Sequence, residues 1–197
     1  MFELYEAVNS IYCYPNSNIL VNKLNIHDNK KLATVERKLV LLKLYTLRQN
    51  KNIGNFDIHH FLSIHKFLFE DIYPFAGKIR SEDIAKDNFR FAKWEYIEDQ
   101  LRELFDKLAK DDLKNLSKKE ISKKLAYYMS ELNVLHPFRE GNGRTIRELV
   151  REICFDCGYV IDWYEINHDD ILRASIKAVV DETEQIKMLR RSIKKMH

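Results

Sequence analysis

Glycine and proline are scarce in this sequence of 197 residues, which has five glycines and three prolines. β-Sandwiches, barrels and propellers need many tight turns, and glycine supplies most turn positions with positive φ. The scarcity argues against these folds, and against collagen-like or low-complexity chains. Hydrophobic residues make up 45% of the chain and aromatic residues 12%, which is enough to fill a core. We therefore expect an all-α, mainly helical protein.

Signals for export, membrane insertion and disulfide bonding are also missing. The first ten residues, MFELYEAVNS, contain neither the basic nor the apolar segment of a secretory leader. No stretch approaches 18 apolar residues, so we expect no membrane partner. The three cysteines are an odd number and favour reduced thiols in a cytoplasmic protein. Cys154 and Cys157 supply only half of a zinc site, and we interpret them as buried helical cysteines.

Basic and acidic residues are nearly balanced, 33 against 30, and the net charge is +3. That balance does not by itself indicate a nucleic-acid partner. Lysines and arginines gather at residues 118–124 and 190–195, and we interpret both clusters as solvated helix faces. A basic helical nucleic-acid binder is thus a hypothesis supported only by these clusters, and no direct nucleic-acid partner is expected.

Three histidines, His59, His60 and His65, lie close together in the sequence but one, five and six residues apart. Helical metal sites use spacings of three or four, so these side chains do not share a face and a metal site is not favoured. Trp94 and Tyr96 are predicted to be packing residues, because no basic stripe surrounds them to suggest base stacking.

Apolar residues recur at helical spacing along most of the chain. Asp57 is predicted to cap one helix, and Ser117 with Glu120 forms a capping-box match that begins another. Residues 79–92 (IRSEDIAKDNFRFA) alternate apolar and polar side chains around a turn and predict a short β-hairpin, the only good strand candidate. Helices are expected at about residues 29–47, 58–68, 94–108, 117–135, 143–157, 167–180 and 183–195.

One segment, HPFREGNGRTIR at residues 136–147, gathers the groups that phosphate-transfer chemistry needs. His136 has a side chain whose ordinary pKa, about 6.5, suits a general base. Glu140 supplies a hard oxygen ligand for Mg²⁺ beside phosphates. Gly141 and Gly143 let main-chain amides approach an anion at the start of a helix.

Two arginines follow on the first turns of that helix. Arg144 and Arg147 are three residues apart, share a face and can both grip phosphate oxygens. Each feature alone has an ordinary explanation, such as a capped helix end, a turn or a Glu–Arg pair. Their occurrence together at a single loop-to-helix junction predicts a phosphate-transfer site.

This segment resembles the signature of the Fic family, H-P-F-x-[DE]-G-N-G-R-x-x-R, and matches it at every defined position. FLFEDIYPFAGKIRSEDIAKDNFRFA, at residues 67–92, is similar to the helix end and flap hairpin of that family. The resemblance covers about residues 30–180. We accordingly divide the chain into an N-terminal extension, residues 1–27, and a Fic domain, residues 28–197.

The resemblance implies a helical bundle with a short β-hairpin flap beside the active-site loop. It also implies an enzyme that transfers AMP from ATP to a Tyr, Thr or Ser hydroxyl of a target protein and releases pyrophosphate. Carried over by position, His136 is the general base, Glu140 is the Mg²⁺ ligand, and Phe138 anchors the loop in the core. The residues that the resemblance assigns to ATP phosphates are Gly141, Asn142, Gly143, Arg144 and Arg147.

The hairpin gains a role from the same resemblance, because an exposed strand edge can pair with an extended segment of the target. Ile84, Ala85 and Lys86 are the candidates for that edge. Lys86, Asp87 and Asn88 form the tip, and Lys86 and Asn88 are also candidates for ATP contact. A purely structural hairpin remains an open alternative.

Gly143 distinguishes between reactions within the family. A kinase-like branch that resembles Doc has lysine at this position, where it obstructs the anion hole and favours transfer of the γ-phosphate. Gly143 therefore favours AMP transfer. A phosphocholine-transferring relative means that the motif alone does not fix the nucleotide donor.

Many Fic proteins carry an inhibitory helix with the motif [ST]-x-x-x-E-[GN], and no Ser or Thr of this chain has Glu four residues later. This absence resembles the toxin–antitoxin subgroup, in which a small separate antitoxin supplies the glutamate. We expect such a partner to contact Arg147, the arginine nearest the γ-phosphate. Type II topoisomerase subunits are the targets suggested by analogy. The alternative function is a non-enzymatic interaction module that kept the Fic fold.

Overall fold

The computed structural model describes residues 10–49, 54–86 and 89–196. This part of the chain is mainly helical, as predicted, and its strands are only two or three residues long. The helices are α1 (Asn29–Gln49), α2 (Ile58–Phe69), α3 (Trp94–Lys110), α4 (Lys118–Leu135), α5 (Asn142–Asp156), α6 (His168–Ala178), α7 (Thr183–Ser192) and the short 3₁₀ helix η1 (Trp163–Glu165). The strands are β1 (Ala85–Lys86), β2 (Phe89–Arg90), β3 (Tyr159–Ile161) and β4 (Ile193–Lys195).

Helix boundaries follow local capping chemistry. The Asp57 carboxylate accepts a hydrogen bond from the His60 amide at 2.7 Å and begins α2. Ser117 and Glu120 form the predicted capping box at the start of α4. Such caps satisfy amides that have no partner inside the helix. Gly158, with φ 78°, follows the end of α5 in the left-handed conformation that glycine adopts most readily.

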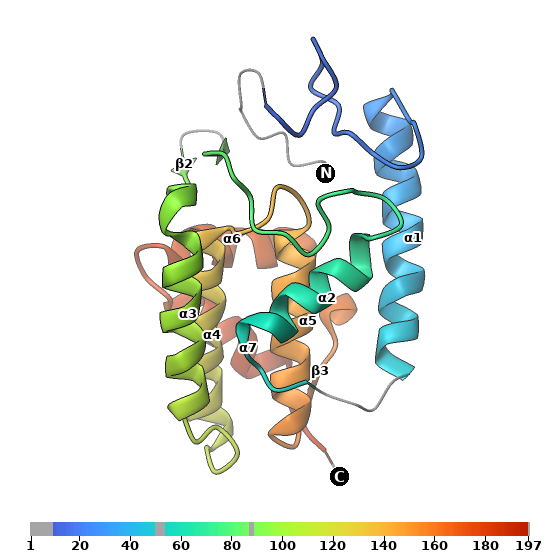
Figure 1. Cartoon of the computed structure of the whole chain (residues 1–197). Helices are drawn as coiled ribbons and strands as arrows, with labels where there is room; N and C mark the ends of the chain where they lie inside the picture. Colours follow the sequence, from blue (N-terminus) through green and yellow to red (C-terminus); the bar gives the residue numbers. More distant parts are fainter. Residues whose placement is uncertain (1–9, 50–53, 87–88, 197) are drawn as a thin grey trace.

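Helices α4 and α5 form the centre of the bundle. α4 contacts α3, α5, α6 and α7, while α5 also contacts α2 and β3. α1 and α3 lie on opposite sides, with α2 and α5 between them (Figure 1). No helix among the described residues has both the length and the apolar character needed to cross a membrane. Fully buried side chains of this core include Leu32, Phe61, Ile72, Ile97, Leu101, Ile121, Leu125, Phe138, Ile146 and Leu189.

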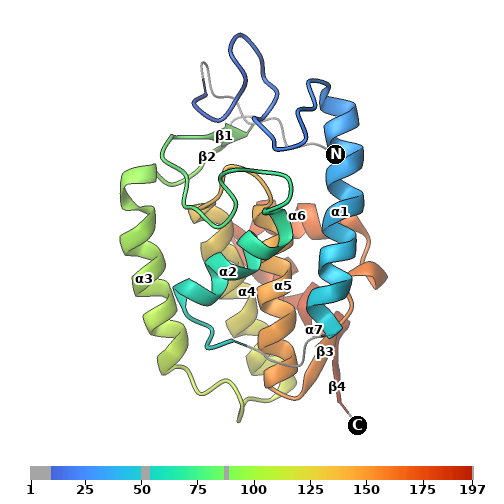
Figure 2. The same ribbon diagram turned by 45° about the vertical axis from the view of Figure 1, so that its right-hand side comes forward.

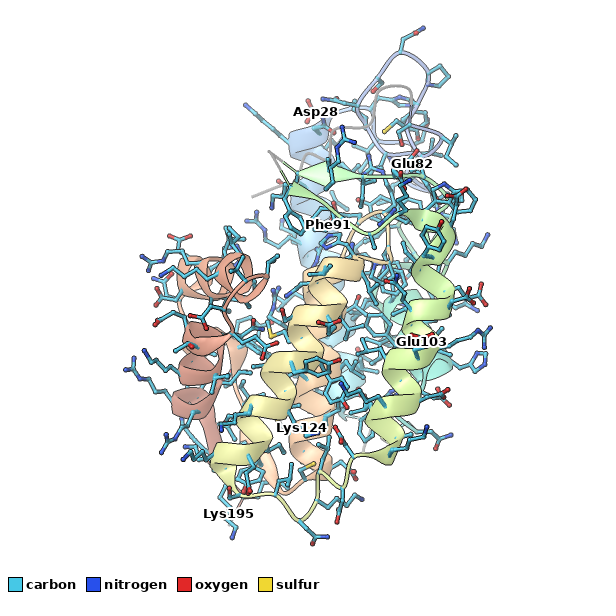
Figure 3. All side chains as sticks on the ribbon, turned by 90° about the vertical axis from the view of Figure 1, so that its left-hand side faces the viewer. Asp28, Glu82, Phe91, Glu103, Lys124 and Lys195 are labelled. Carbon is cyan, nitrogen blue, oxygen red and sulfur yellow. The ribbon has the colours of Figure 1, made fainter. Side chains whose placement is uncertain are left out.

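The predicted site lies at one end of this bundle. The loop that joins α4 to α5, the β1–β2 hairpin and the N-terminal segment gather at that end, whereas β3 and β4 lie at the other (Figure 2). The side view shows Glu82 and Phe91 at the hairpin end and Lys195 at the far end (Figure 3). The hairpin pairs Ala85 with Arg90 and Lys86 with Phe89, which confirms the predicted strands.

A second small sheet corrects two predictions. The last helix ends at Ser192 rather than Lys195, and residues 193–195 form β4, which pairs antiparallel with β3. The hairpin was therefore not the only strand pair. Three-residue strands are too short to leave an alternating pattern that stands out from a helical one. Ile193 is fully buried, so its apolar character extended the helical pattern past the true end.

The two neighbouring cysteines differ from each other. Cys154 is buried inside α5, as predicted, and burial raises the pKa of its thiol to about 12. Cys157 is only half-buried and lies at the C-cap of α5 rather than inside the helix. Burial also raises the pKa of the Cys157 thiol, to about 11. Both side chains therefore stay protonated at neutral pH.

Residues 10–27, which precede α1, pack on the helical bundle. The Ser10 hydroxyl donates to Glu82 at 2.6 Å, and the Lys23 amide donates to the Ile72 carbonyl at 2.8 Å. The Tyr12 ring meets the Phe75 ring edge-on at 5.3 Å. These contacts bring residues 10–27 to the end of the molecule that carries the loop between α4 and α5.

Candidate active site

His136 ends α4 and faces the start of α5. Its backbone is left-handed, with φ 46° and ψ 59°. The ring Nδ1 lies 3.1 Å from the Asn133 carbonyl oxygen. Because a carbonyl can only accept, we assign the proton to Nδ1, which leaves the lone pair of the neutral ring on Nε2. The Phe91 ring stacks on the imidazole at 3.9 Å. The Asn133 carbonyl and the Phe91 ring thus hold the imidazole in one tautomer and one orientation.

The loop after His136 is closed by Asn142. The Asn142 side chain accepts from the Phe138 amide at 2.8 Å and donates to the Phe138 carbonyl at 2.7 Å. Phe138 is fully buried, as predicted for a core anchor. Its ring stacks on His65 with centroids 3.7 Å apart. The loop is therefore held by the packing of Phe138 in the core and by the two hydrogen bonds of the Asn142 side chain.

His65 holds the loop at Glu140. The Gly77 amide donates to Nδ1 of His65 at 2.8 Å, so Nε2 carries the proton and donates to the Glu140 carbonyl at 2.9 Å. Burial lowers the pKa of His65 to about 3, and the ring is neutral at physiological pH. The sequence favoured a surface or core-edge histidine here, whereas His65 is fully buried, and its bond to Glu140 joins residues that are distant in the chain.

A buried network of charges surrounds Arg144. Its guanidinium donates to Glu36 at 2.7 Å and to Glu140 at 3.2 Å. The Tyr73 hydroxyl also donates to Glu36, whose carboxylate is buried. Burial is the main cause that raises the pKa of Tyr73, and the Glu36 charge adds to it. The arginine predicted for phosphate contact is thus held between carboxylates, and Glu36 and Tyr73 had escaped the sequence analysis.

The glycines at the start of α5 have different physical requirements. Gly141 has φ 83°, and a Cβ there would lie 2.3 Å from Cζ of Phe69. A Cβ on Gly143 would lie 3.1 Å from Nη1 of Arg147, so this guanidinium extends over Gly143. Gly141 is the N-cap and has no side chain to cap the first amides of α5. Helix N-termini of this kind attract anions.

One carboxylate in the loop suits a magnesium ion. Glu140 Oε1 lies 2.8 Å from the Gly141 amide, beside the N-terminus of α5. Within the described ranges, no group of three or more His, Cys, Asp or Glu side chains is placed to hold a metal. Mg²⁺ at nucleotide sites takes one or two carboxylates and obtains its other ligands from phosphates and water. A single carboxylate at an anion-attracting helix start therefore fits a nucleotide-bound magnesium ion.

The hairpin lies beside this loop. Ile84 is buried, precedes β1, and accepts a hydrogen bond from the Phe91 amide at 3.3 Å. Ala85 and Lys86 form β1 and are half-buried. The predicted tip residues Asp87 and Asn88 lie outside the described residues.

Two further arginines tie the loop to its surroundings, and sequence analysis had given neither a role. Arg139 donates to Glu82 at 3.0 Å, and Glu82 also accepts from the Ser10 hydroxyl. Arg80 is buried and donates to the His136 carbonyl at 2.9 Å. Neither pattern nor spacing indicated these contacts, since each joins segments far apart in the chain.

Comparisons with known proteins agree with this geometry. The model of the Fic/DOC family matches residues 55–154. Protein adenylyltransferase VbhT of Bartonella schoenbuchensis is 39% identical over 186 residues, which are 94% of this chain and 39% of VbhT. The chain thus spans well under half of that relative. The probable protein adenylyltransferase Fic of Salmonella typhimurium is 32% identical, over 79% of this chain and 77% of its own length.

Solved structures share the fold. The N-terminal Fic domain of a VirB-translocated Bep effector from Bartonella quintana, solved with bound ADP, superposes with a TM-score of 0.87 at 27% identity. The match covers 94% of this chain and 95% of that one. BepC of Bartonella tribocorum has the same fold, with a TM-score of 0.87 at 24% identity over 94% of this chain and 97% of its own.

Proposed function

The chain belongs to the Fic/DOC family, and on this premise we propose that it is a protein adenylyltransferase, which transfers AMP from ATP to a hydroxyl group of a target protein. Relatives that this chain matches over most of their length bear the name probable protein adenylyltransferase. A solved relative holds ADP. These names and that ligand favour an enzyme over an interaction module.

One observation carries the proposal. His136 has Nδ1 on the Asn133 carbonyl and a ring stacked by Phe91, at the point where the chain turns into the N-terminus of α5. A fixed base thus stands at a helix start that attracts phosphate. Positioning and charge neutralisation are the main contributions of a protein to transfer at phosphorus.

The proposed reaction assigns the proton transfer to His136. The target hydroxyl oxygen attacks the α-phosphorus of ATP, and its proton passes to Nε2 of His136. The bond between the α-phosphorus and the bridging oxygen breaks, and pyrophosphate leaves with that electron pair. His136 then holds the proton until it is released after the transfer. The Asn133 carbonyl accepts from Nδ1–H before and after this transfer, so Nε2 is the nitrogen that takes the proton.

The phosphates are proposed to lie on the main chain of Gly141, Asn142 and Gly143. Glu140 would hold Mg²⁺, which when bound neutralises phosphate charge. Arg147 extends over Gly143 and is proposed to reach the outer phosphates. Arg144 is held by Glu36 and Glu140. A guanidinium has five donors, so Arg144 can hold the loop and still face a phosphate.

The target is proposed to lie along the hairpin. β1 consists of Ala85 and Lys86, and an extended segment could add to its edge by main-chain pairing. Ile84 supports this edge from inside the molecule, and Lys86 and Asn88 are proposed to contact ATP as well. Main-chain pairing requires no sequence motif in the target, so Tyr, Thr and Ser acceptors are all compatible with it.

Control of the activity is proposed to come from a second protein. The chain lacks the inhibitory motif, and a small antitoxin that presents a glutamate to Arg147 would block the outer phosphates. The proposed location is the cytoplasm, and type II topoisomerase subunits are the targets proposed by analogy with the toxin-like subgroup.

Mass spectrometry of a cell lysate tests the activity and identifies the target together. Lysate treated with the purified chain and ATP should contain peptides that carry AMP on a hydroxyl side chain. The His136→Ala variant is the matched control and should give none. If the wild-type chain, with no partner added, produced no AMP-carrying peptides, an adenylyltransferase that is active without an inhibitor would be refuted. The interaction module would then be favoured.

A further inference from the structure

Arg80 is a large, fully buried side chain between α2 and β1 that lies outside the signature segment. It is 1% exposed. A buried guanidinium is tolerated only where its donors have partners. Arg80 donates to the carbonyls of Glu82 at 2.6 Å, of Leu135 at 3.3 Å and of His136 at 2.9 Å, and also to that of Ala92. One side chain therefore binds four main-chain oxygens.

These oxygens come from three parts of the chain. Glu82 precedes the hairpin, Ala92 follows it, and the remaining two oxygens end α4. Main-chain bonds join the same segments, because the Arg80 amide donates to Pro137 at 2.8 Å and the Ala92 amide donates to Val134 at 3.1 Å. Both legs of the hairpin are thus bonded to the end of the helix that carries His136.

The end of α4 at His136 needs hydrogen-bond donors from outside the helix. The last carbonyls of a helix have no partner inside it, and arginine is a common donor to them. His136 also has a left-handed backbone, which a side chain other than glycine adopts rarely. Arg80 binds its carbonyl, while Phe91, the neighbour of Ala92, stacks on its ring. The backbone and the ring of the base are therefore both held by the hairpin.

We propose that Arg80 is a positioning residue that couples the hairpin to the general base. Binding of a target segment along the hairpin and orientation of the His136 ring then occur together. The proposal rests on the proposed adenylyltransferase function and extends it. Lysine could not replace Arg80, because an ammonium is a point donor and does not span four separated carbonyls as a planar fork does.

The first test compares Arg80→Lys with the wild-type chain in AMP transfer. Arg80→Lys keeps the charge, and we expect kcat to fall by about tenfold or more and the KM for the target to rise, because small misplacement of a base has large effects. The Kd for ATP, measured by calorimetry, should change by less than about twofold, since the Arg80 side chain binds the end of α4 and the legs of the hairpin, and its main-chain bond to Pro137 is kept in the lysine variant. A purely structural role would lower stability and leave kcat and KM per folded molecule unchanged.

Arg48→Lys is the matched control. Arg48 makes a comparable fork onto buried Glu148, at 3.2 Å and 3.0 Å, at the far end of α1. Its replacement should reduce stability without changing kcat or KM. A loss of kcat in both variants would show that general destabilisation, rather than coupling, is responsible.

Native-state hydrogen exchange tests the coupling in the wild-type chain, whether or not Arg80→Lys folds. In low urea, the amides of Arg80 and Ala92 should open together and have protection factors equal within about threefold. Independent opening of the two legs would overturn the proposal, as would Arg80→Lys with the kcat and KM of the wild type. If the wild-type chain transfers no AMP, the proposed function fails, and exchange alone decides whether the hairpin and the helix end are coupled.

Discussion

His65 on α2 donates a hydrogen bond from Nε2 to the main-chain oxygen of Glu140, 2.9 Å away in the loop between α4 and α5. The ring is fixed from the other side as well, because Nδ1 accepts from the Gly77 amide. Only the neutral tautomer with hydrogen on Nε2 satisfies both bonds. The position of the loop that carries Glu140 therefore depends on an uncharged histidine.

This bond predicts a pH dependence of stability. The folded pKa of His65 is about 3, because of burial, and its ordinary value is 6.5. Between these values the unfolded chain binds a proton that the folded chain does not, so stability is lost as the pH falls below 6.5. The slope from this group is at most about 1.4 kcal/mol per pH unit. Urea unfolding between pH 7.5 and 4.5 measures it.

Two glutamine variants separate His65 from other titrating groups. His65→Gln should be less stable at pH 7 and should lose less stability on acidification than the wild type. His27→Gln, at an exposed position, should keep the wild-type slope. Identical slopes for the wild type and His65→Gln would contradict the assignment of a neutral, buried His65.

Gly141→Ala should destabilise the fold more than Gly158→Ala. Both glycines have a left-handed backbone, with φ 83° and 78°, which costs about 1–2 kcal/mol for alanine. Only at Gly141 would the added Cβ also collide with the Phe69 ring, whereas nothing lies within 4 Å at Gly158. Overpacking of this kind adds about 1–3 kcal/mol. Chemical denaturation measures the loss of unfolding free energy in both variants. Equal losses would show that the Phe69 ring moves aside at no cost in stability.

Glu36→Gln should reduce the free energy of unfolding by about 1–3 kcal/mol, because it removes the charge of a buried carboxylate that accepts from half-buried Arg144. Glu36 accepts from Arg144 at 2.7 Å and from the Tyr73 hydroxyl. The control is Glu98→Gln, whose exposed pair with Arg102 should contribute about 0–1 kcal/mol. Urea denaturation at pH 7 compares the two. A loss no larger than that of the control would mean that Glu36 is dispensable for holding Arg144.

Gly143→Lys should slow AMP transfer by about hundredfold or more, since it puts a long side chain where the phosphates are proposed to lie. Gly143→Ala should slow transfer less than Gly143→Lys does, because its shorter side chain meets the flexible end of Arg147, at 3.1 Å. Initial rates, with melting temperatures to check folding, measure the effect. Wild-type rates for the lysine variant would argue against phosphates at Gly143.

The elements of the fold that sequence analysis located are those with local causes. Asp57 and Ser117 cap helices through residues three positions away, and such spacing is visible in a sequence. The segment at 136–147 is also local, so its residues are brought together by a single turn of chain. For this reason the base, the loop carboxylate and the helix start were all predicted near one another.

The residues that support the site were missed for the opposite reason. Glu36, His65 and Arg80 reach it across 108, 75 and 56 residues of chain, respectively. Contacts between residues so far apart leave no periodic pattern in the sequence. The sequence also does not show whether a given arginine or histidine is buried or exposed. β3 and β4 were missed because three paired residues do not produce a recognisable alternation.

The most direct measurement compares ATP labelled at the α-phosphate with ATP labelled at the γ-phosphate, using the purified chain and a target-containing lysate. We expect label on protein from α-labelled ATP that depends on the added chain, and none above background from γ-labelled ATP. His136→Ala should transfer no label and still unfold in a cooperative thermal transition, since Arg80 binds the main chain of His136 rather than its ring. Chain-dependent transfer of the γ-label, or a His136→Ala variant as active as the wild type, would contradict the account.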